Sequence, residues 1–381
     1  TGTGALSNRT FFYEEITVSG SVFPKFCVVH DKHLVVAGAG TALNTIFYSG
    51  TSDINSFTSS GSGSVVLDDQ VVGIKSFRAD LIIFCKNSIY KLSNINDADT
   101  IAITPITKNV GCLDGHSIQE IGGDLLFLSP DGFRLVAGTE RIGDVELGSV
   151  SRQIQSVVST IAKSIDGFFV SSAVLRSKSQ YRFFYSAATG TTGTSKGLIG
   201  TITPNGFEWS ETIGIQAHGF ASGLDFSNIE QIYHGDSAGY VYNHNTGNDF
   251  NPAGVQTNIN ARYKTPNLDF GDAGTLKSLH YTKISFTPEG AVQPNLKVSY
   301  DFDSLDRPQP PLYTLDEIPT PAVFGAGTLG SSVFGAAGDP MVRTAVQGSG
   351  HNIAFKIFSQ DTKAPYSING FYVDYRPSGR R

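Results

Sequence analysis

The chain has 381 residues, of which 40% are hydrophobic, enough to bury a large core. Only 16% are charged, against about 25% in an ordinary soluble domain, and the formal net charge is −6. Proteins that bind nucleic acid tightly usually carry more Lys and Arg than Asp and Glu, so the negative net charge argues against tight DNA binding. The three cysteines form no CxxC pair, so we expect buried free thiols rather than a disulfide framework.

The first part of the chain consists of short apolar runs separated by glycine-rich turns. These runs are rich in β-branched and aromatic residues, which favour a pleated, partly buried surface. The strands expected before residue 78 are Leu34–Ala37, Thr45–Ser49, Val65–Leu67 and Val71–Phe77. Many short strands of this kind indicate an all-β protein.

Two hairpins of the same design follow. In the first, Leu81–Cys85 meets a two-residue turn and returns as Ser88–Leu92. In the second, Leu125–Leu128 meets the turn SPDG and returns as Phe133–Ala137. A hairpin that recurs after about 40 to 50 residues is typical of a β-propeller blade, a unit that cannot bury its faces alone.

One segment breaks the strand pattern and predicts a helix over about residues 149–166. Its apolar residues recur at helical spacing, at Val150, Ile154, Val157, Val158, Ile161 and Ile165. Ser149 or Ser151 is the expected N-cap, and Asp166–Gly167 is the expected C-terminal stop. The apolar face of this helix needs a sheet or another subunit to cover it.

Strands resume after the helix. They are expected at Gly167–Leu175, Gln180–Ala187, Gly197–Thr203, Phe207–Ile213, Ile229–His234 and Tyr240–Asn243. With the preceding hairpins they make about five blade-like units before residue 250. We therefore predict a β-propeller-like body over residues 1–247, with several four-stranded blades and one inserted helix.

The composition changes after Asn245, where TGNDFNPAG reads as a linker. Longer strands joined by wide turns follow, and they predict a β-sandwich-like domain over residues 248–381. Within it, residues 307–339 are rich in Pro and Gly without periodicity and are expected to form an extended loop. An alternative is that some of these strands close the propeller ring by joining the N-terminal strands.

Two glycine motifs match enzyme signatures, but their surroundings argue against both. Gly325–Gly330 matches GxGxxG without the preceding buried strand and following helix that a dinucleotide site requires. Gly193–Gly197 matches GxSxG, but a strand rather than a helix follows it. We interpret both as glycine-rich loops, and we expect no cofactor and no catalytic residue.

The metal-ligand candidates lack diagnostic spacing. They are Asp301, Asp303, Asp306, His30, His33, His234 and His244. The three aspartates lack the glycine and the final glutamate of a calcium loop. Neither histidine pair has a second set of ligands at zinc-site spacing, so no metal site is predicted.

The basic C-terminal end, Arg376, Arg380 and Arg381, is the one cluster of cations in the sequence. It is either a solvated tail or a salt-bridged contact to a neighbouring subunit, because bidentate arginine pairs fix the register of an interface. These three residues are the candidate subunit contact.

Several segments stand in a specific order along the chain. They are FYSGTSDINSFTSS (Phe47–Ser60), LIIFCKNSIYKL (Leu81–Leu92), Ile103–Thr139 with its LSPDGFR turn, FEWSETIG (Phe207–Gly214), YHGDSAGYVY (Tyr233–Tyr242), TPNLDFGD with the following Lys277, and the closing YSINGFYVDYRPSGRR. Together they resemble the tail-nozzle or tail-stabilisation (tail tubular B-like) proteins of short-tailed bacteriophages. Their order is more specific than any single hairpin.

The resemblance implies a propeller-containing structural subunit of the virion rather than an enzyme. Such subunits form a ring, commonly a homo-hexamer, at the distal end of the tail. The ring attaches beneath a tail adaptor, offers surfaces for tail fibres, and meets the host cell surface indirectly. It closes the channel until double-stranded DNA is ejected through its lumen. The candidate gate or mobile loops hold Gly190, Gly193, Gly325, Gly327 and Gly330.

Two other functions stay open. A glycan-binding propeller would show an exposed aromatic platform and act as a monomer. A propeller glycoside hydrolase would need two carboxylates that converge at the ring centre, which the sequence does not mark. Oligomeric state separates the nozzle ring from both.

Overall fold

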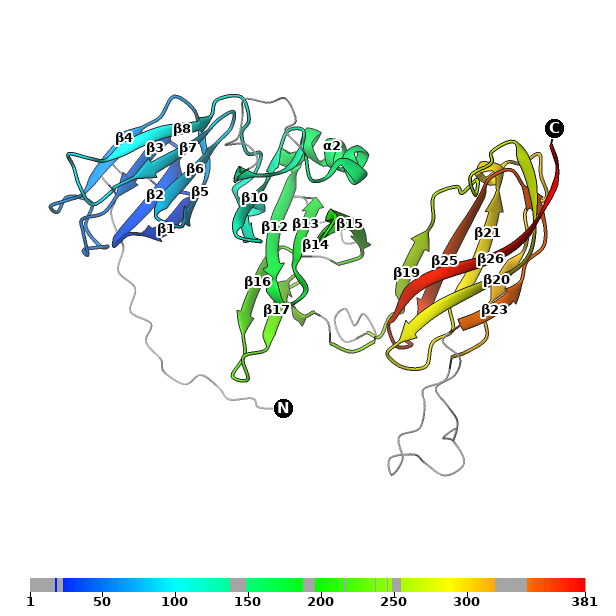
Figure 1. Cartoon of the computed structure of the whole chain (residues 1–381). Coiled ribbons are helices and arrows are strands. Elements are labelled where there is room, and N and C mark those ends of the chain that lie inside the picture. The colour runs from blue at the N-terminus through cyan, green and yellow to red at the C-terminus, as the bar shows by residue number, and fades with distance from the viewer. Residues whose placement is uncertain are drawn as a thin grey trace. The chain divides into compact units, whose positions relative to one another are not determined.

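The computed structural model describes residues 18, 23–137, 149–187, 196–215, 217–236, 238–244, 246–248, 255–318 and 341–380. The chain divides into two compact units, Thr1–Asn245 and Thr246–Arg381, called unit 1 and unit 2 below. Both are built mainly from antiparallel strands (Figure 1), so the predicted all-β class is confirmed.

The described residues of unit 1 form five sheets, each made of strands that are consecutive in the chain (Figure 1). The first has β1 (Phe26–His30), β2 (His33–Ala39), β3 (Ala42–Tyr48) and β4 (Gly63–Val66); the second has β5 (Val71–Phe77), β6 (Asp80–Cys85), β7 (Ile89–Ser93) and β8 (Ala102–Thr107). The third has β9 (Gln119–Ile121), β10 (Asp124–Ser129) and β11 (Gly132–Leu135). The fourth has β12 (Phe168–Leu175), β13 (Gln180–Ala187), β14 (Lys196–Thr203) and β15 (Gly206–Ile213), and the fifth has β16 (Gly219–Leu224), β17 (Glu230–Gly235) and β18 (Val241–Asn243).

The sheets of unit 1 pack in chain order. Three pairs of neighbouring sheets touch through their first strands, since β1 contacts β5, β9 contacts β12, and β12 contacts β16. The second and third sheets meet in a shared core. Antiparallel meanders packed side by side through their first strands are the arrangement of propeller blades. The predicted propeller-like body with its two hairpins, β6–β7 and β10–β11, is therefore confirmed.

The unbroken apolar runs of the inner sheets follow from this packing. Side chains alternate across a strand, so an inner strand serves two cores. Leu81 and Ile83 of β6 join the core shared with the first sheet, whereas Ile82 and Phe84 join the core shared with the third. Phe84 meets Phe127 of β10 with ring centroids 5.2 Å apart. An inner blade thus needs apolar residues at successive positions.

The predicted helix forms as three short pieces, η2 (Arg152–Ile154), α2 (Gln155–Lys163) and η3 (Ile165–Gly167). Val158 and Ile161 of α2 are buried in the core of the third and fourth sheets, so the helix covers part of unit 1 itself. The expected serine N-cap bond is absent, because the Ser151 hydroxyl instead accepts the backbone N–H of Phe133 at 3.0 Å. Among the described residues, no helix is long and apolar enough to cross a membrane.

Unit 2 is a sandwich of two sheets (Figure 1), called the β19 sheet and the β20 sheet. The β19 sheet has the order β19 (Ile259–Lys264), β25 (Ile353–Asp361), β21 (Asn295–Tyr300) and β22 (Leu312–Thr314). In the β20 sheet, β20 (Thr275–Pro288) pairs with β23 (Met341–Ala345), β24 (Ser349–Gly350) and β26 (Tyr366–Arg380). Within the described ranges these strands pair only with one another, so they form the predicted sandwich rather than joining the strands of unit 1.

A buried lysine holds the first loop of unit 2. Lys277 is 1% exposed, and its Nζ donates to the backbone carbonyls of Asp272, Thr275 (3.0 Å) and His351 (2.9 Å). Three acceptors satisfy the three N–H bonds of an ammonium group, which offsets the cost of burying its charge. These three bonds explain the lysine that follows the LDFGD segment: Lys277 fixes the loop that leads into β20.

Candidate binding surfaces

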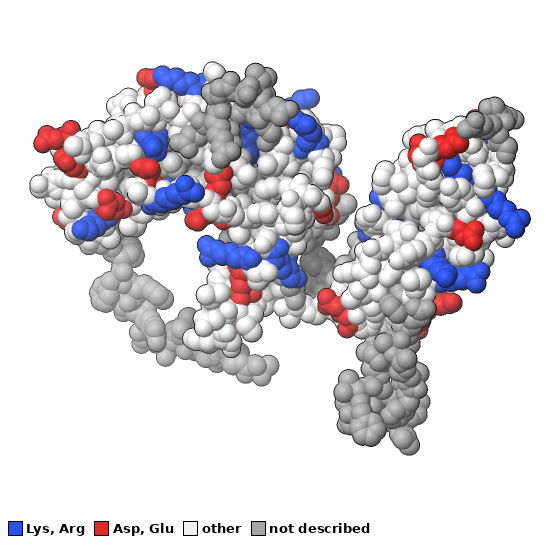
Figure 2. Space-filling model, viewed as in Figure 1, with Lys and Arg blue, Asp and Glu red and all other residues white. Residues whose placement is uncertain are grey.

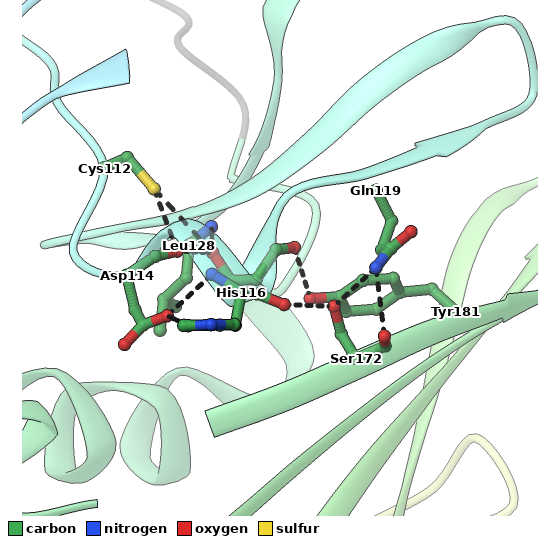
Figure 3. A network of polar contacts seen from close by, with 8 residues as sticks. Cys112, Asp114, His116, Gln119, Leu128, Ser172 and Tyr181 are labelled. Carbon is green, nitrogen blue, oxygen red and sulfur yellow. Dashed lines mark hydrogen bonds and ion pairs between the residues drawn. The ribbon is translucent and has the colours of Figure 1, made fainter. Parts of the chain in front are cut away.

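A polar network surrounds η1 (Gly115–Ser117), a 3-10 turn (Figure 3). In the sequence this turn lies between the second and third sheets, and in space it contacts β5, β10 and β12. Asp114 caps the turn, because its Oδ1 accepts the backbone N–H of His116 at 2.7 Å. The Tyr181 hydroxyl donates to the carbonyl of Ser117 at 2.8 Å, and the Ser172 hydroxyl donates to the carbonyl of His116. The network therefore ties η1 to β12 and β13 of the fourth sheet.

This network is built for support rather than for nucleophilic chemistry. Cys112 is wholly buried, and burial raises the pKa of its thiol to about 12. A thiol is nucleophilic only as the thiolate, so Cys112 is inert near neutral pH. A hydrogen bond to Asp114 raises the pKa of the exposed His116. Cys85 and Cys112 are buried free thiols as predicted, whereas Cys27 is exposed.

Two histidines meet between the fourth and fifth sheets. His234 Nδ1 lies 2.6 Å from His244 Nε2, and His244 Nδ1 lies 3.3 Å from the guanidinium of Arg182. An arginine can only donate, so His244 accepts at Nδ1 and donates from Nε2 to His234. The chain of bonds holds both imidazoles neutral. Burial is the main cause that lowers both pKa values, that of His244 to about 3.

The two terminal sheets of unit 1 leave apolar side chains uncovered. In the first sheet, Val29 is 61% and Val66 is 68% exposed. In the fifth, Val241 is 73% exposed, and Leu224 and Phe226 extend into solvent at the β16–β17 hairpin. In the inner sheets, β6 and β10 bury apolar residues at successive positions, although Ile213 of β15 is 77% exposed. Each end of the blade series therefore presents a surface that a further sheet would cover.

In unit 2, aromatic and charged side chains gather on the outer side of the β20 sheet. We call this surface the β20 face; it comprises Tyr281, Lys283, Arg343, Tyr372, Asp374 and Arg376. The Arg343 guanidinium lies over the Tyr281 ring, 4.1 Å from its centroid, and the Lys283 ammonium lies 6.0 Å from it. Figure 2 shows both basic and acidic side chains, set among uncharged residues, on the part of unit 2 that holds β20 and β26.

A second hollow opens in unit 2 beside β19 and has a volume of about 600 Å³. Its walls come from β19, β25 and β26. Tyr263 and Phe371 stack there with centroids 6.2 Å apart, and Tyr263 is 48% exposed. Asp361 and Asn369 add polar groups to the lining. Aromatic walls with a few polar groups are the usual composition of a small-ligand site.

The structure places only part of the predicted site residues. Arg376 lies on β26 in the β20 face, whereas Arg380 is described only by its backbone and Arg381 lies outside the described residues. The five glycines of the candidate gate loops, Gly190, Gly193, Gly325, Gly327 and Gly330, also lie outside them. The subunit contact and the gate loops therefore stay predictions. No site was predicted at Tyr281, Lys283, Arg343 and Tyr372, because only the strand register brings these residues together.

Neither a protein-family model nor a curated protein matches the sequence. Solved structures with a similar fold include BBS1N in complex with ARL6DN, at 12% identity and a TM-score of 0.27, covering 56% of this chain and 72% of that one. A family 43 arabinoxylan arabinofuranohydrolase from Bacillus subtilis has 11% identity and a TM-score of 0.22, covering 92% and 95%. An exo-β-1,3-galactanase from Phanerochaete chrysosporium has 9% identity and a TM-score of 0.23, covering 91% and 94%.

These comparisons correct one expectation. The sequence led us to exclude an enzyme, and that exclusion is wrong, because two of these three structures are glycoside hydrolases. At such low TM-scores the likeness assigns no activity to this chain. What stands is the coarser description: an all-β protein with a propeller-like unit followed by a sandwich.

Proposed function

We propose that the chain is a subunit of the tail nozzle of a short-tailed bacteriophage, assembled as a closed ring in the virion. The observation that carries the proposal is the pair of uncovered apolar surfaces at the two ends of unit 1, at Val29 and Val66 and at Leu224 and Val241. The order of the segments that resemble nozzle proteins supports it. In this role the ring contacts a tail adaptor and tail fibres.

Two different apolar surfaces on one subunit suit a head-to-tail contact. When the rotation between neighbours closes, such a heterologous contact gives a ring rather than a filament. Covering exposed valine and leucine side chains stabilises the contact by about 25 cal/mol for each Å² of apolar surface buried.

The charge distribution suits a channel for DNA. Unit 2 contains as many Lys and Arg as Asp and Glu residues, so unit 1 carries the whole net charge of −6. Duplex DNA binds tightly where cations replace its counterions. An acidic unit 1 around the lumen would let DNA pass without being retained.

We expect the purified chain to form a ring, alone or with its adaptor, and the variants Val241→Asp and Val66→Asp to be monomeric. A carboxylate at either surface would be buried unpaired in the contact, which costs several kcal/mol. Native mass spectrometry measures the copy number. Leu305→Asp is the matched control, since Leu305 is 101% exposed in unit 2. A chain that stays monomeric with and without the adaptor contradicts the proposal.

A second candidate function, saccharide binding, is favoured by the hollow beside β19. The exposed Tyr263 ring offers a flat apolar surface for a sugar ring, and Asp361 and Asn369 can bond its hydroxyls. If a neutral oligosaccharide binds there, Tyr263→Ala should weaken binding about tenfold in calorimetric titration. Tyr240→Ala, an equally exposed tyrosine of unit 1, should leave it unchanged. Equal effects of both changes would count against this site.

A further inference from the structure

We propose that the β20 face is a binding site for a saccharide that carries carboxylate groups. The site is distinct from the hollow beside β19 and does not rest on ring formation. It consists of three cations, two tyrosines and one aspartate on the outer side of β20, β23 and β26.

The strand register brings these residues together. Lys283 of β20 stands opposite Arg343 of β23 on one side and opposite Tyr372 of β26 on the other. Residues directly opposite in antiparallel strands share a face and lie within contact distance. Tyr281 stands opposite Asp374 in the neighbouring row. Two surface hollows, of about 500 and 610 Å³, adjoin this grid and share Tyr281 and Asp374.

The cations of this face are available to a ligand. Among the described residues, no carboxylate lies within 4.0 Å of Lys283, Arg343 or Arg376, although seven ion pairs occur elsewhere. The one carboxylate on the face, Asp374, lies in the row of Tyr281 and raises the pKa of that hydroxyl. Arg343 is held in place over the Tyr281 ring, so little side-chain freedom remains to be lost on binding.

The aromatic groups favour a saccharide over another anion. Tyr372 is 58% exposed and adjoins Lys283, so a sugar ring can lie on its face while a carboxylate reaches the ammonium and the Arg343 fork. Asp374 can accept bonds from sugar hydroxyls, whereas it would repel the phosphates of DNA. Because unit 2 has no net charge, no wide positive field draws long polyanions to it.

The test is titration calorimetry of the full chain with oligogalacturonate, which carries a carboxylate on every sugar. Its methyl ester, of the same shape without charge, is the ligand control. We expect the acid form to bind at low salt and the ester to bind at least about tenfold more weakly, with salt weakening the former. Arg343→Ala and Tyr372→Ala should each lower affinity about five- to tenfold.

Matched variants make the result decisive. Lys297→Ala removes an exposed cation of β21 in the other sheet and should leave binding unchanged. Arg343→Lys keeps the charge without the planar fork and should fall between wild type and Arg343→Ala. The proposal is overturned if the ester binds as well as the acid, if duplex DNA binds as tightly, or if no binding occurs. It is also overturned if Arg343→Ala changes the oligomeric mass and not ligand affinity, which would mark a subunit contact. Ring assembly is measured separately, by mass.

Discussion

Replacing Phe133 with alanine is expected to lower the free energy of unfolding of unit 1 by about 3 to 5 kcal/mol, the usual cost of removing a buried phenyl ring. Phe133 is fully buried where the third and fourth sheets meet. Its ring stacks on Trp209 with centroids 4.9 Å apart and contacts Phe183 edge-on at 5.3 Å. Truncation leaves a cavity among large rings that cannot collapse to fill it.

The measurement is urea unfolding followed by tryptophan emission. Trp209 is the only tryptophan, and its Nε1 donates to the carbonyl of Val150 at 2.7 Å, so its emission reports this core. Phe226→Ala is the matched control, because Phe226 is fully exposed on a hairpin, and its loss should change stability by less than about 0.5 kcal/mol. Equal effects of the two changes would show that the aromatic cluster does not hold unit 1 together.

Acid is expected to weaken unit 1 through His244. Its pKa is lowered from 6.5 to about 3, first by burial and then by His234 and Arg182. Between pH 6.5 and about pH 3 the unfolded chain binds a proton at His244 that the folded chain does not bind. The contribution of the neutral His244 to stability is therefore fully present above about pH 7 and decreases as the pH drops. Between pH 7 and pH 5 the loss should be about 1 to 2 kcal/mol for this half-buried group.

The variant His244→Gln tests this directly. It can still accept from Arg182 and donate to His234, but it does not titrate, so its stability should depend less on pH between 7 and 5 than that of the wild type. His116→Gln is the opposite control. The pKa of His116 is raised by Asp114, so that histidine stabilises the fold more at low pH, and its removal should steepen the loss. Urea titrations at several pH values measure both slopes. If His244→Gln keeps the wild-type slope, the histidine pair is not the sensor.

The hairpins could be predicted from the sequence because all their information is local. Each hairpin combines an apolar run with a turn signal, LIIFC before a two-residue turn and LLFL before SPDG, and so predicts a buried strand and the turn that ends it. The helix was also predictable from its spacing, but its cap was not. Ser151 bonds to Phe133, a residue that reaches it only through the tertiary fold.

The binding surfaces were beyond such reasoning for a different cause. Lys283, Arg343 and Tyr372 become neighbours through strand register, which no spacing in the sequence records. The exposure of apolar side chains on the first and fifth sheets could not be predicted for a related reason. Val241 lies in an alternating strand that resembles the others in sequence, and nothing in that pattern marks it as 73% exposed.

The order of strand pairing has a consequence for how the chain is made. Every sheet of unit 1 is complete once its own consecutive strands have left the ribosome, so blades can form one after another with short loops to close. Unit 2 cannot do this, since β20 pairs along its length with β26, from Thr275 opposite Arg380 to Pro288 opposite Tyr366. Until β26 emerges, the long β20 strand has an open edge that invites pairing between nascent chains. Deletion of β26 should therefore cause aggregation of unit 2 during synthesis, while the blades of unit 1 still fold.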